Sequence, residues 1–202
     1  MDLINCPYCN LHTYTKYKHT SVIVCLNCKT PIVKERKTSA PAKIVFAGKP
    51  NESNFDLMHK SFWYNQSSYE ITGYIRYFYT EGYLYQWAAY NNKKYIWLCE
   101  SLGNWFVLSP ENDMEDIDAA TLRPDHFFSY KEKKYKVDGL SAFYNYYMEG
   151  ELPDFLYNHA KGVSIECSNQ DELIQFNIYP DNLIEMYTGK CVDFKDLKVS
   201  LS

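Results

Sequence analysis

The stretch SYEITGYIRYFY, residues 68–79, alternates its side chains with a period of two and is rich in aromatic and β-branched residues. This alternation is typical of a β-strand with one buried face. The same pattern continues in YLYQWAAY (83–90), KYIWLCES (94–101) and NWFVLS (104–109). The short connections contain Glu81-Gly82, Asn91-Asn92 and Gly103-Asn104. Because these residues favour tight turns, the segments predict an antiparallel meander.

The opening motif occurs a second time. FSYKEKKYKVDGL (128–140) resembles WYNQSSYEITGY (63–74), and both contain Tyr-x-(Ile/Val)-x-Gly. The two copies are Tyr69-Ile71-Gly73 and Tyr135-Val137-Gly139, preceded by Trp63 or Phe128 and followed by an aromatic-rich run that ends in Glu81-Gly82 or Glu149-Gly150. A glycine inside a strand marks a bulge or a close backbone approach. We therefore expect two β units with similar curvature.

The second unit continues in four further β-prone segments. They are GVSIECS (162–168), ELIQFNIY (172–179), LIEMY (183–187) and GKCVDF (189–194). ELIQF is also compatible with a short helical turn. The 202-residue chain contains 20 Tyr, 11 Phe and 4 Trp but only 8 Gly and 8 Pro, a composition that favours β structure. We expect a mainly β fold, with an antiparallel β domain at 57–202 and related meander units at about 57–110 and 122–198.

Four cysteines near the N-terminus form two Cys-x-x-Cys pairs, Cys6 with Cys9 and Cys25 with Cys28. Two residues between cysteines let one tight turn aim both sulfurs at a single ion, and two such turns supply the tetrahedral shell that Zn²⁺ prefers. Asn10 follows the first pair and tolerates a left-handed backbone. The spacing predicts a structural zinc ribbon over residues 1–36. Residues 11–24 between the pairs suggest a hairpin with its turn near Lys18–Thr20.

Other readings of the cysteine pairs stay open. One is iron in a rubredoxin-like shell, which uses the same four ligands. Another is a pair of disulfides, which would require a secretory route, and a third is a redox pair, which would require a thioredoxin-like fold.

The start of the chain has neither a basic segment nor an apolar run, so we expect no signal peptide and a cytoplasmic protein with reduced cysteines. No run of about 18 apolar residues predicts a membrane span. We place His12 and His19 at the surface.

Charge is divided unevenly along the chain. Residues 1–50 hold eight basic and two acidic residues, a formal +6, whereas the other 152 hold 13 basic and 23 acidic residues, a formal −10. The basic ribbon is therefore suited either to dock on the acidic body or to bind an anionic partner. Between them, residues 37–56 carry charge and proline and are expected to form a linker or extended arm, in which KIVFAG (43–48) is a candidate edge strand.

Several stretches together resemble a bacterial family. The ribbon is followed by YEITGYIRY (69–77), YQWAAYNNKKYIWLCESLGNWFVL (85–108) and VDGLSAFYNYYMEGELP (137–153). Over roughly residues 55–200 this order is similar to the domain of unknown function numbered 4178. This chain departs from the family pattern at Ala88-Ala89, at the Asn91-Asn92 loop and at Asn10. The family has no established catalytic residues to transfer. Its gene neighbourhoods, with aminopropyltransferase-like and envelope-stress proteins, imply a cytosolic interaction partner.

The body shows no recognisable catalytic motif. His59, His126 and His159 lack metal or triad spacing, and the acidic loop lacks the spacing of a calcium site. That loop contains Glu111, Asp113, Glu115, Asp116 and Asp118. Cys99, Cys167 and Cys191 lie on expected strands and are interpreted as small core residues. If Glu100 and Glu166 are buried, Arg76 and Arg123 are their natural partners.

Tyrosines on both faces of the expected strands suggest a binding surface. In residues 74–79, Ile75 indicates that Ile75, Tyr77 and Tyr79 face the core, which leaves Tyr74 and Arg76 as outward candidates for partner binding. Two other interpretations compete: the tyrosines only cover the sheet, or they form a stacking platform for a carbohydrate or nucleobase. We expect a non-enzymatic adaptor that binds other proteins. The alternatives are a nucleic-acid-binding accessory protein that uses the basic ribbon, and an enzyme whose site the sequence does not reveal.

Overall fold

The computed structural model describes residues 2–18, 20–34, 56–80, 82–114, 117–153, 161–170, 172–180 and 182–200. Fourteen strands and two short 3₁₀ helices lie in these ranges. The ribbon contains β1 (Leu3–Asn5), β2 (His12–Tyr14), β3 (Val22–Val24) and β4 (Pro31–Val33). The first unit contains β5 (Ser61–Tyr64), β6 (Ser67–Tyr79), β7 (Gly82–Tyr90), β8 (Tyr95–Ser101) and β9 (Asn104–Glu111). The rest of the body contains η1 (Ala119–Thr121), β10 (Phe127–Tyr130), β11 (Lys133–Leu152), β12 (Gly162–Ser168), β13 (Leu173–Ile178), β14 (Ile184–Val192) and η2 (Phe194–Leu197).

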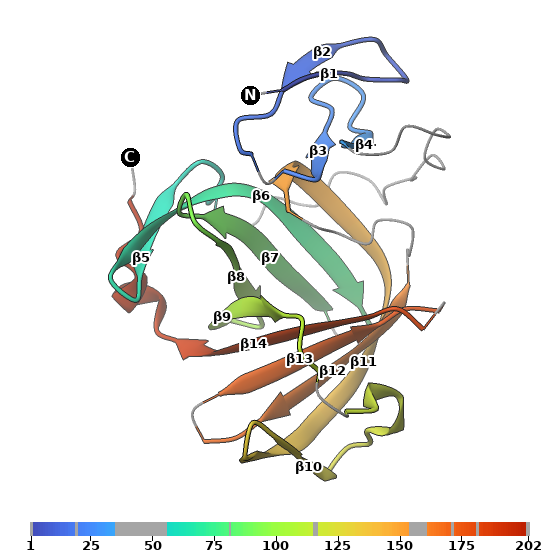
Figure 1. The fold of residues 1–202 in the computed structure, drawn as a ribbon, viewed down its shortest axis with the longest axis vertical. Helices are drawn as coiled ribbons and strands as arrows, with labels where there is room; N and C mark the ends of the chain where they lie inside the picture. Colours follow the sequence, from blue (N-terminus) through green and yellow to red (C-terminus); the bar gives the residue numbers. More distant parts are fainter. Residues whose placement is uncertain are drawn as a thin grey trace.

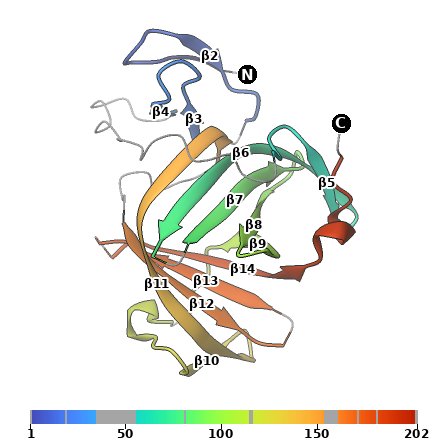
Figure 2. The ribbon, with the colours of Figure 1, turned by 180° about the vertical axis from the view of Figure 1, so that it is seen from behind.

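Eight of these strands close into an antiparallel barrel. Their order is β6-β7-β8-β9-β14-β13-β12-β11, and β11 pairs with β6 to complete the circle. Figure 1 shows β6 to β8 on one side and β11 to β14 on the other, and Figure 2 shows the same arrangement from behind. The predicted mainly β, antiparallel fold is confirmed. ELIQF belongs to β13, so its helical alternative is wrong.

The two meander units repeat one another in detail. Each opens with a two-residue hairpin turn whose central residues both have positive φ, Asn65-Gln66 (46° and 60°) and Lys131-Glu132 (45° and 63°). These values are typical of type I′ turns, whose twist matches that of the paired strands. Phe62 then stacks on Tyr69 at 5.7 Å, and Phe128 on Tyr135 at 5.8 Å.

The expected bulges are present at both motif glycines. The register of β6 on β7 shifts between Ile71 and Gly73, and that of β11 on β12 shifts between Val137 and Gly139. Two details of the predicted alignment are wrong. The counterpart of Phe128 is Phe62 rather than Trp63, because Phe62 is the residue that pairs with Tyr69. The two Glu-Gly pairs are also not equivalent, since Gly82 begins a strand and Gly150 lies within β11.

Three apolar clusters fill the body. The cluster inside the barrel draws on both units, for example through Ile75, Trp97, Phe143 and Tyr187. A second cluster belongs to the first unit and is closed by Leu197 of η2. A third belongs to the second unit and is closed by η1. Both faces of much of the sheet are therefore buried, which explains why aromatic residues occupy alternating and adjacent positions in the sequence.

The ribbon is attached to the end of β11. This 20-residue strand pairs with β10 and β12 in its first part, with β6 in its second part, and with β3 through Glu151 and Leu152. Val22 and Val24 of β3 join the cluster inside the barrel. In the part of the chain that the structure describes, β2 pairs with β1, and β3 with β4 and β11. The expected β2–β3 hairpin is therefore wrong.

The predicted linker falls almost entirely outside the described residues, as does the candidate strand KIVFAG within it. The boundaries 1–36, 37–56 and 57–202 stay predictions.

Candidate metal centre and its attachment to the barrel

The two cysteine turns of the ribbon have the same backbone geometry. In the first, the Asn10 N–H donates to the Cys6 carbonyl at 3.0 Å, and the Cys6 N–H donates to the Leu11 carbonyl at 2.9 Å. In the second, Lys29 and Thr30 take the places of Asn10 and Leu11, with distances of 2.9 and 2.9 Å. Asn10 and Lys29 have φ of 58° and 56°. The left-handed conformation expected for Asn10 is confirmed, and Lys29 adopts it as well.

These turns bring the four cysteine sulfurs together. The Sγ atoms of Cys6 and Cys28 are 3.5 Å apart, and those of Cys9 and Cys25 are 3.6 Å apart. All four lie within 4.8 Å of one another. A disulfide needs about 2.05 Å between sulfurs, so the cysteines are free thiols in this arrangement. Among the described residues, this is the only cluster of three or more ligand side chains close enough to share an ion.

The four thiols have different environments. Cys6 and Cys25 are buried with Ile23 and Ile32 in the small core of the ribbon, whereas Cys28 is exposed. A hydrogen bond with the Thr30 hydroxyl is the main cause that lowers the pKa of Cys28 to about 6. The backbone N–H of Leu11 lowers the pKa of Cys9, and burial raises that of Cys6 to about 12. The exposed Cys28 thus favours its thiolate at neutral pH.

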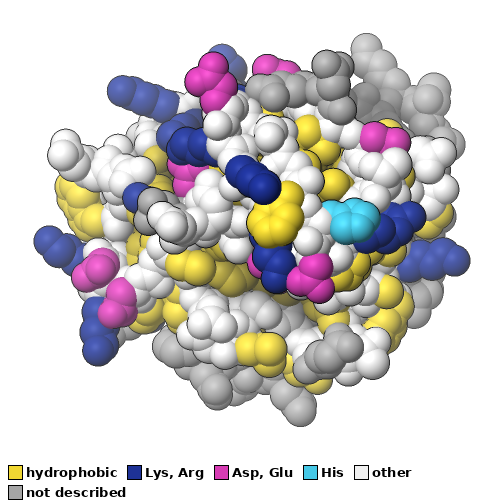
Figure 3. All heavy atoms as spheres, turned by 90° about the horizontal axis from the view of Figure 1, so that it is seen from below, with side chains coloured by type: hydrophobic (Ala, Val, Ile, Leu, Met, Phe, Trp, Pro, Cys, Tyr) yellow, Lys and Arg dark blue, Asp and Glu magenta, His cyan; other side chains and the backbone are white. Residues whose placement is uncertain are grey.

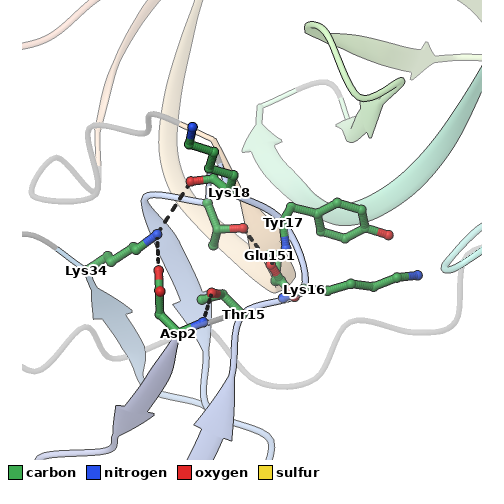
Figure 4. A network of polar contacts seen from close by, with 8 residues as sticks. Asp2, Thr15, Lys16, Tyr17, Lys18, Lys34 and Glu151 are labelled. Carbon is green, nitrogen blue, oxygen red and sulfur yellow. Dashed lines mark hydrogen bonds and ion pairs between the residues drawn. The ribbon is translucent and has the colours of Figure 1, made fainter.

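Glu151 of β11 attaches the ribbon to the barrel. Its carboxylate accepts hydrogen bonds from the backbone N–H groups of Lys16 and Tyr17, at 2.8 and 3.2 Å, and from the Thr20 hydroxyl at 2.5 Å (Figure 4). A single carboxylate therefore organises the loop that connects the two cysteine turns.

Ion pairs between ribbon and barrel add to this attachment. Lys16 pairs with Glu70 at 2.6 Å, and Lys29 pairs with Glu149 at 3.4 Å. The Tyr17 ring packs edge-on against Tyr90 at 5.7 Å. The basic ribbon does dock on acidic side chains of the body, one of the two uses expected from the uneven charge.

The candidate partner-binding pair does not lie as expected. Ile75 and Tyr77 are buried in the core, as predicted, but Arg76 is only 4% exposed. Its guanidinium lies 3.7 Å from the centre of the Tyr83 ring, so a neighbouring strand covers it. Tyr74 is half-buried, and its hydroxyl donates to Glu149 at 3.4 Å. The expectation that Arg76 is exposed is wrong because β7 supplies a layer of rings outside β6.

The remaining candidate residues that the structure describes do not converge on a reactive site. Cys99 and Cys167 are buried, as expected, and burial raises the pKa of each thiol. Cys191 is exposed, so its assignment to the core is wrong. His12, His59 and His126 are exposed. His19, His159, Glu115 and Asp116 lie outside the described residues.

The expected arginine–glutamate partners also differ from the structure. The Glu100 carboxylate accepts from the Gly103 N–H at 2.8 Å and so caps the β8–β9 turn. Arg123 donates to the carbonyls of Ala120 and Leu122. Glu166 is exposed. These carboxylates therefore do not require an arginine.

No family model, curated protein or solved structure matches this chain. The resemblance to the domain of unknown function numbered 4178 stays a prediction. Within the described residues, no helix is long and apolar enough to cross a membrane.

Proposed function

We propose that this chain is a non-enzymatic adaptor in which a structural Zn²⁺ ion holds a ribbon that binds another protein. Cys6, Cys9, Cys25 and Cys28 are the ligands. A tetrahedron with Zn–S bonds of about 2.3 Å has sulfur–sulfur edges of about 3.8 Å. The observed separations of 3.5 and 3.6 Å come close to this value. Four protein thiolates fill the tetrahedron, so no position is left for a substrate water, and the ion has a structural role.

The observation that supports an adaptor is the apolar surface of the ribbon. Among the described residues, five of the twelve exposed large hydrophobic side chains lie on it, although it makes up a small part of the chain. They are Leu3, Tyr8, Leu11, Tyr14 and Leu26. Leu3 pairs directly with Tyr14 across β1 and β2, with exposed fractions of 56% and 65%. Clustered apolar side chains on a rigid surface are typical of protein interfaces.

Charge argues against the nucleic-acid alternative. Lys16, Lys29 and Lys34 of the ribbon pair with Glu70, Glu149 and Asp2. These lysines are therefore engaged in the fold, and few ribbon cations remain to follow a phosphate backbone.

Affinity capture from a native lysate of the source cells tests the adaptor. The wild-type chain should enrich a reproducible set of proteins. Leu3→Asp with Tyr14→Asp should lose that set, since charge in the centre of an apolar interface costs most of its affinity. Leu102→Asp is the matched control, because Leu102 is 77% exposed on the barrel. Unchanged capture by the ribbon variant, or equal loss in the control, contradicts the proposal.

A further inference from the structure

A cavity of about 750 Å³ lies where the ribbon meets the barrel. Lys18 and Lys34 line it from the ribbon, and Lys93 and Lys94 line it from the β7–β8 turn. Tyr90 and Tyr95, which face one another across β7 and β8, form part of its wall. Its volume falls in the range of about 300–1,000 Å³ that is usual for small-molecule sites. Neither the ribbon nor the barrel forms this cavity alone.

The local structure holds the lysines in place. The Asn91 side-chain oxygen accepts from the backbone N–H groups of Lys93 and Lys94, at 3.2 and 3.1 Å. Lys34 reaches the Lys18 carbonyl at 3.4 Å and the Asp2 carboxylate (Figure 4). These contacts fix the backbone at Lys93 and Lys94 and hold the Lys34 ammonium beside Lys18, and all four lysines line the cavity.

The cavity has an excess of positive charge. No Asp or Glu is among its described lining residues. Within the described chain, Lys34 alone of the four lysines pairs with a carboxylate. Two acids close in sequence to lining residues are engaged elsewhere: Glu151 accepts from three ribbon donors, and Glu111 pairs with Lys131 at 2.7 Å. Lys34 is balanced by Asp2, whereas the charges of Lys18, Lys93 and Lys94 repel one another, and a bound anion relieves that repulsion.

A second cavity, of about 360 Å³ on the barrel, has less of this imbalance. It is lined by Lys131, Lys133 and Lys190, of which Lys131 and Lys133 pair with Glu111 and Glu172 at 2.7 Å each. On the face seen from below, basic and acidic side chains are intermixed (Figure 3). Among the described residues, three lysines that pair with no carboxylate thus distinguish the junction cavity from the second cavity.

We infer that this cavity binds a small organic diphosphate, of the nucleoside diphosphate class. Lysine ammoniums bind phosphates as point charges, and two phosphates supply enough negative charge to meet several of them. Tyr90 and Tyr95 offer aromatic surface to a base. A pocket of this size, bounded by a few lysines, accommodates a compact anion, whereas a nucleic-acid strand needs an extended basic track. This inference is independent of protein binding by the ribbon surface.

Calorimetric titration of the full chain at low ionic strength tests the inference, with ADP, pyrophosphate and inorganic phosphate as probes. ADP and pyrophosphate should bind, and inorganic phosphate should bind at least about tenfold more weakly, because it offers fewer charged contacts. Lys93→Ala with Lys94→Ala should weaken ADP binding by about tenfold or more. Lys18→Ala should also weaken it from the ribbon side.

The matched control is Lys195→Ala with Lys198→Ala, since both lysines are exposed near η2 and away from the cavity. Its ADP affinity should equal that of the wild type. The inference is overturned if neither ADP nor pyrophosphate binds below about 1 mM, or if the control loses as much affinity as the cavity variants. It is also overturned if a single-stranded oligonucleotide binds more tightly than ADP and loses affinity in the same variants.

Discussion

Glu151 and Cys28 show how single residues set the attachment of the ribbon to the barrel and the chemistry of the cysteine cluster. Glu151 sits at the end of a barrel strand and binds the loop between the two cysteine turns. Cys28 sits at the exposed side of the sulfur cluster. The sequence predicted that the four cysteines form one cluster, because each Cys-x-x-Cys spacing is a local pattern. It did not predict the role of Glu151 as hydrogen-bond acceptor for the ribbon loop. Glu151 lies 135 positions from Lys16, and no local sequence pattern marks this role.

At the residue scale, we predict that Cys28 is the most reactive thiol after metal removal. Its pKa of about 6 lies well below the ordinary value of a thiol, so the thiolate predominates at pH 7. Iodoacetamide and peptide mass spectrometry should show that Cys28 is alkylated before Cys99 and Cys167, and that added zinc protects it. Faster labelling of either buried cysteine would contradict the assigned environments.

We also predict that Glu151→Ala loosens the ribbon. Removing the acceptor leaves two backbone N–H groups and a hydroxyl without their partner, at a cost of about 1–3 kcal/mol. Hydrogen exchange should show faster exchange at Lys16 and Tyr17, whereas the strands β12 and β13 remain protected. Glu132→Ala, at an exposed hairpin turn, is the control. Unchanged exchange at Lys16 and Tyr17 would show that the ribbon is held by other contacts.

At the scale of elements, the repeated motif has one strand arrangement and two packing environments. Gly73 and Gly139 occupy the same bulge in the two units. A Cβ atom at Gly73 would lie 2.6 Å from the Glu151 carbonyl oxygen, because β11 crosses β6 there, whereas a Cβ at Gly139 meets nothing within 4 Å. The sequence predicted both bulges. It could not reveal that β11 packs against the first copy of the motif, at Gly73, whereas the Cβ position of Gly139 in the second copy is open.

The two glycines therefore form an internal test of barrel closure. Gly73→Ala should destabilise the protein by about 1–3 kcal/mol, because backbone on both strands must move. Gly139→Ala should change stability by no more than about 0.5 kcal/mol. Chemical denaturation monitored by tryptophan fluorescence measures both. Equal effects of the two substitutions would argue against the close approach of β6 and β11.

At the scale of the whole molecule, ribbon and barrel share a core. The sequence predicted a ribbon and a β body with two related units, because turns, alternation and cysteine spacing are local patterns. It did not predict the barrel or the burial of Arg76, because both depend on strands that are distant in sequence. Val22 and Val24 lie in the cluster inside the barrel. The ribbon and the body, which were expected as separate domains, therefore share apolar packing.

Removing the ribbon tests this shared core. The fragment 56–202 should still unfold cooperatively, since all eight barrel strands remain. It should melt at a lower temperature than the full chain, because the side chains that pack on Val22 and Val24 become exposed. Thermal melts followed by circular dichroism compare the two. Equal melting temperatures would show that the ribbon adds nothing to the stability of the barrel.

Metal analysis of the full chain, purified without added metal, tests the central claim most directly. The account predicts close to one zinc ion per chain in the wild type and in Cys191→Ser, whose cysteine is exposed outside the cluster. It predicts loss of zinc in Cys6→Ser with Cys9→Ser, because two thiolates cannot complete the tetrahedral shell. A metal-free wild type, iron in place of zinc, or zinc retained by the double variant would contradict it.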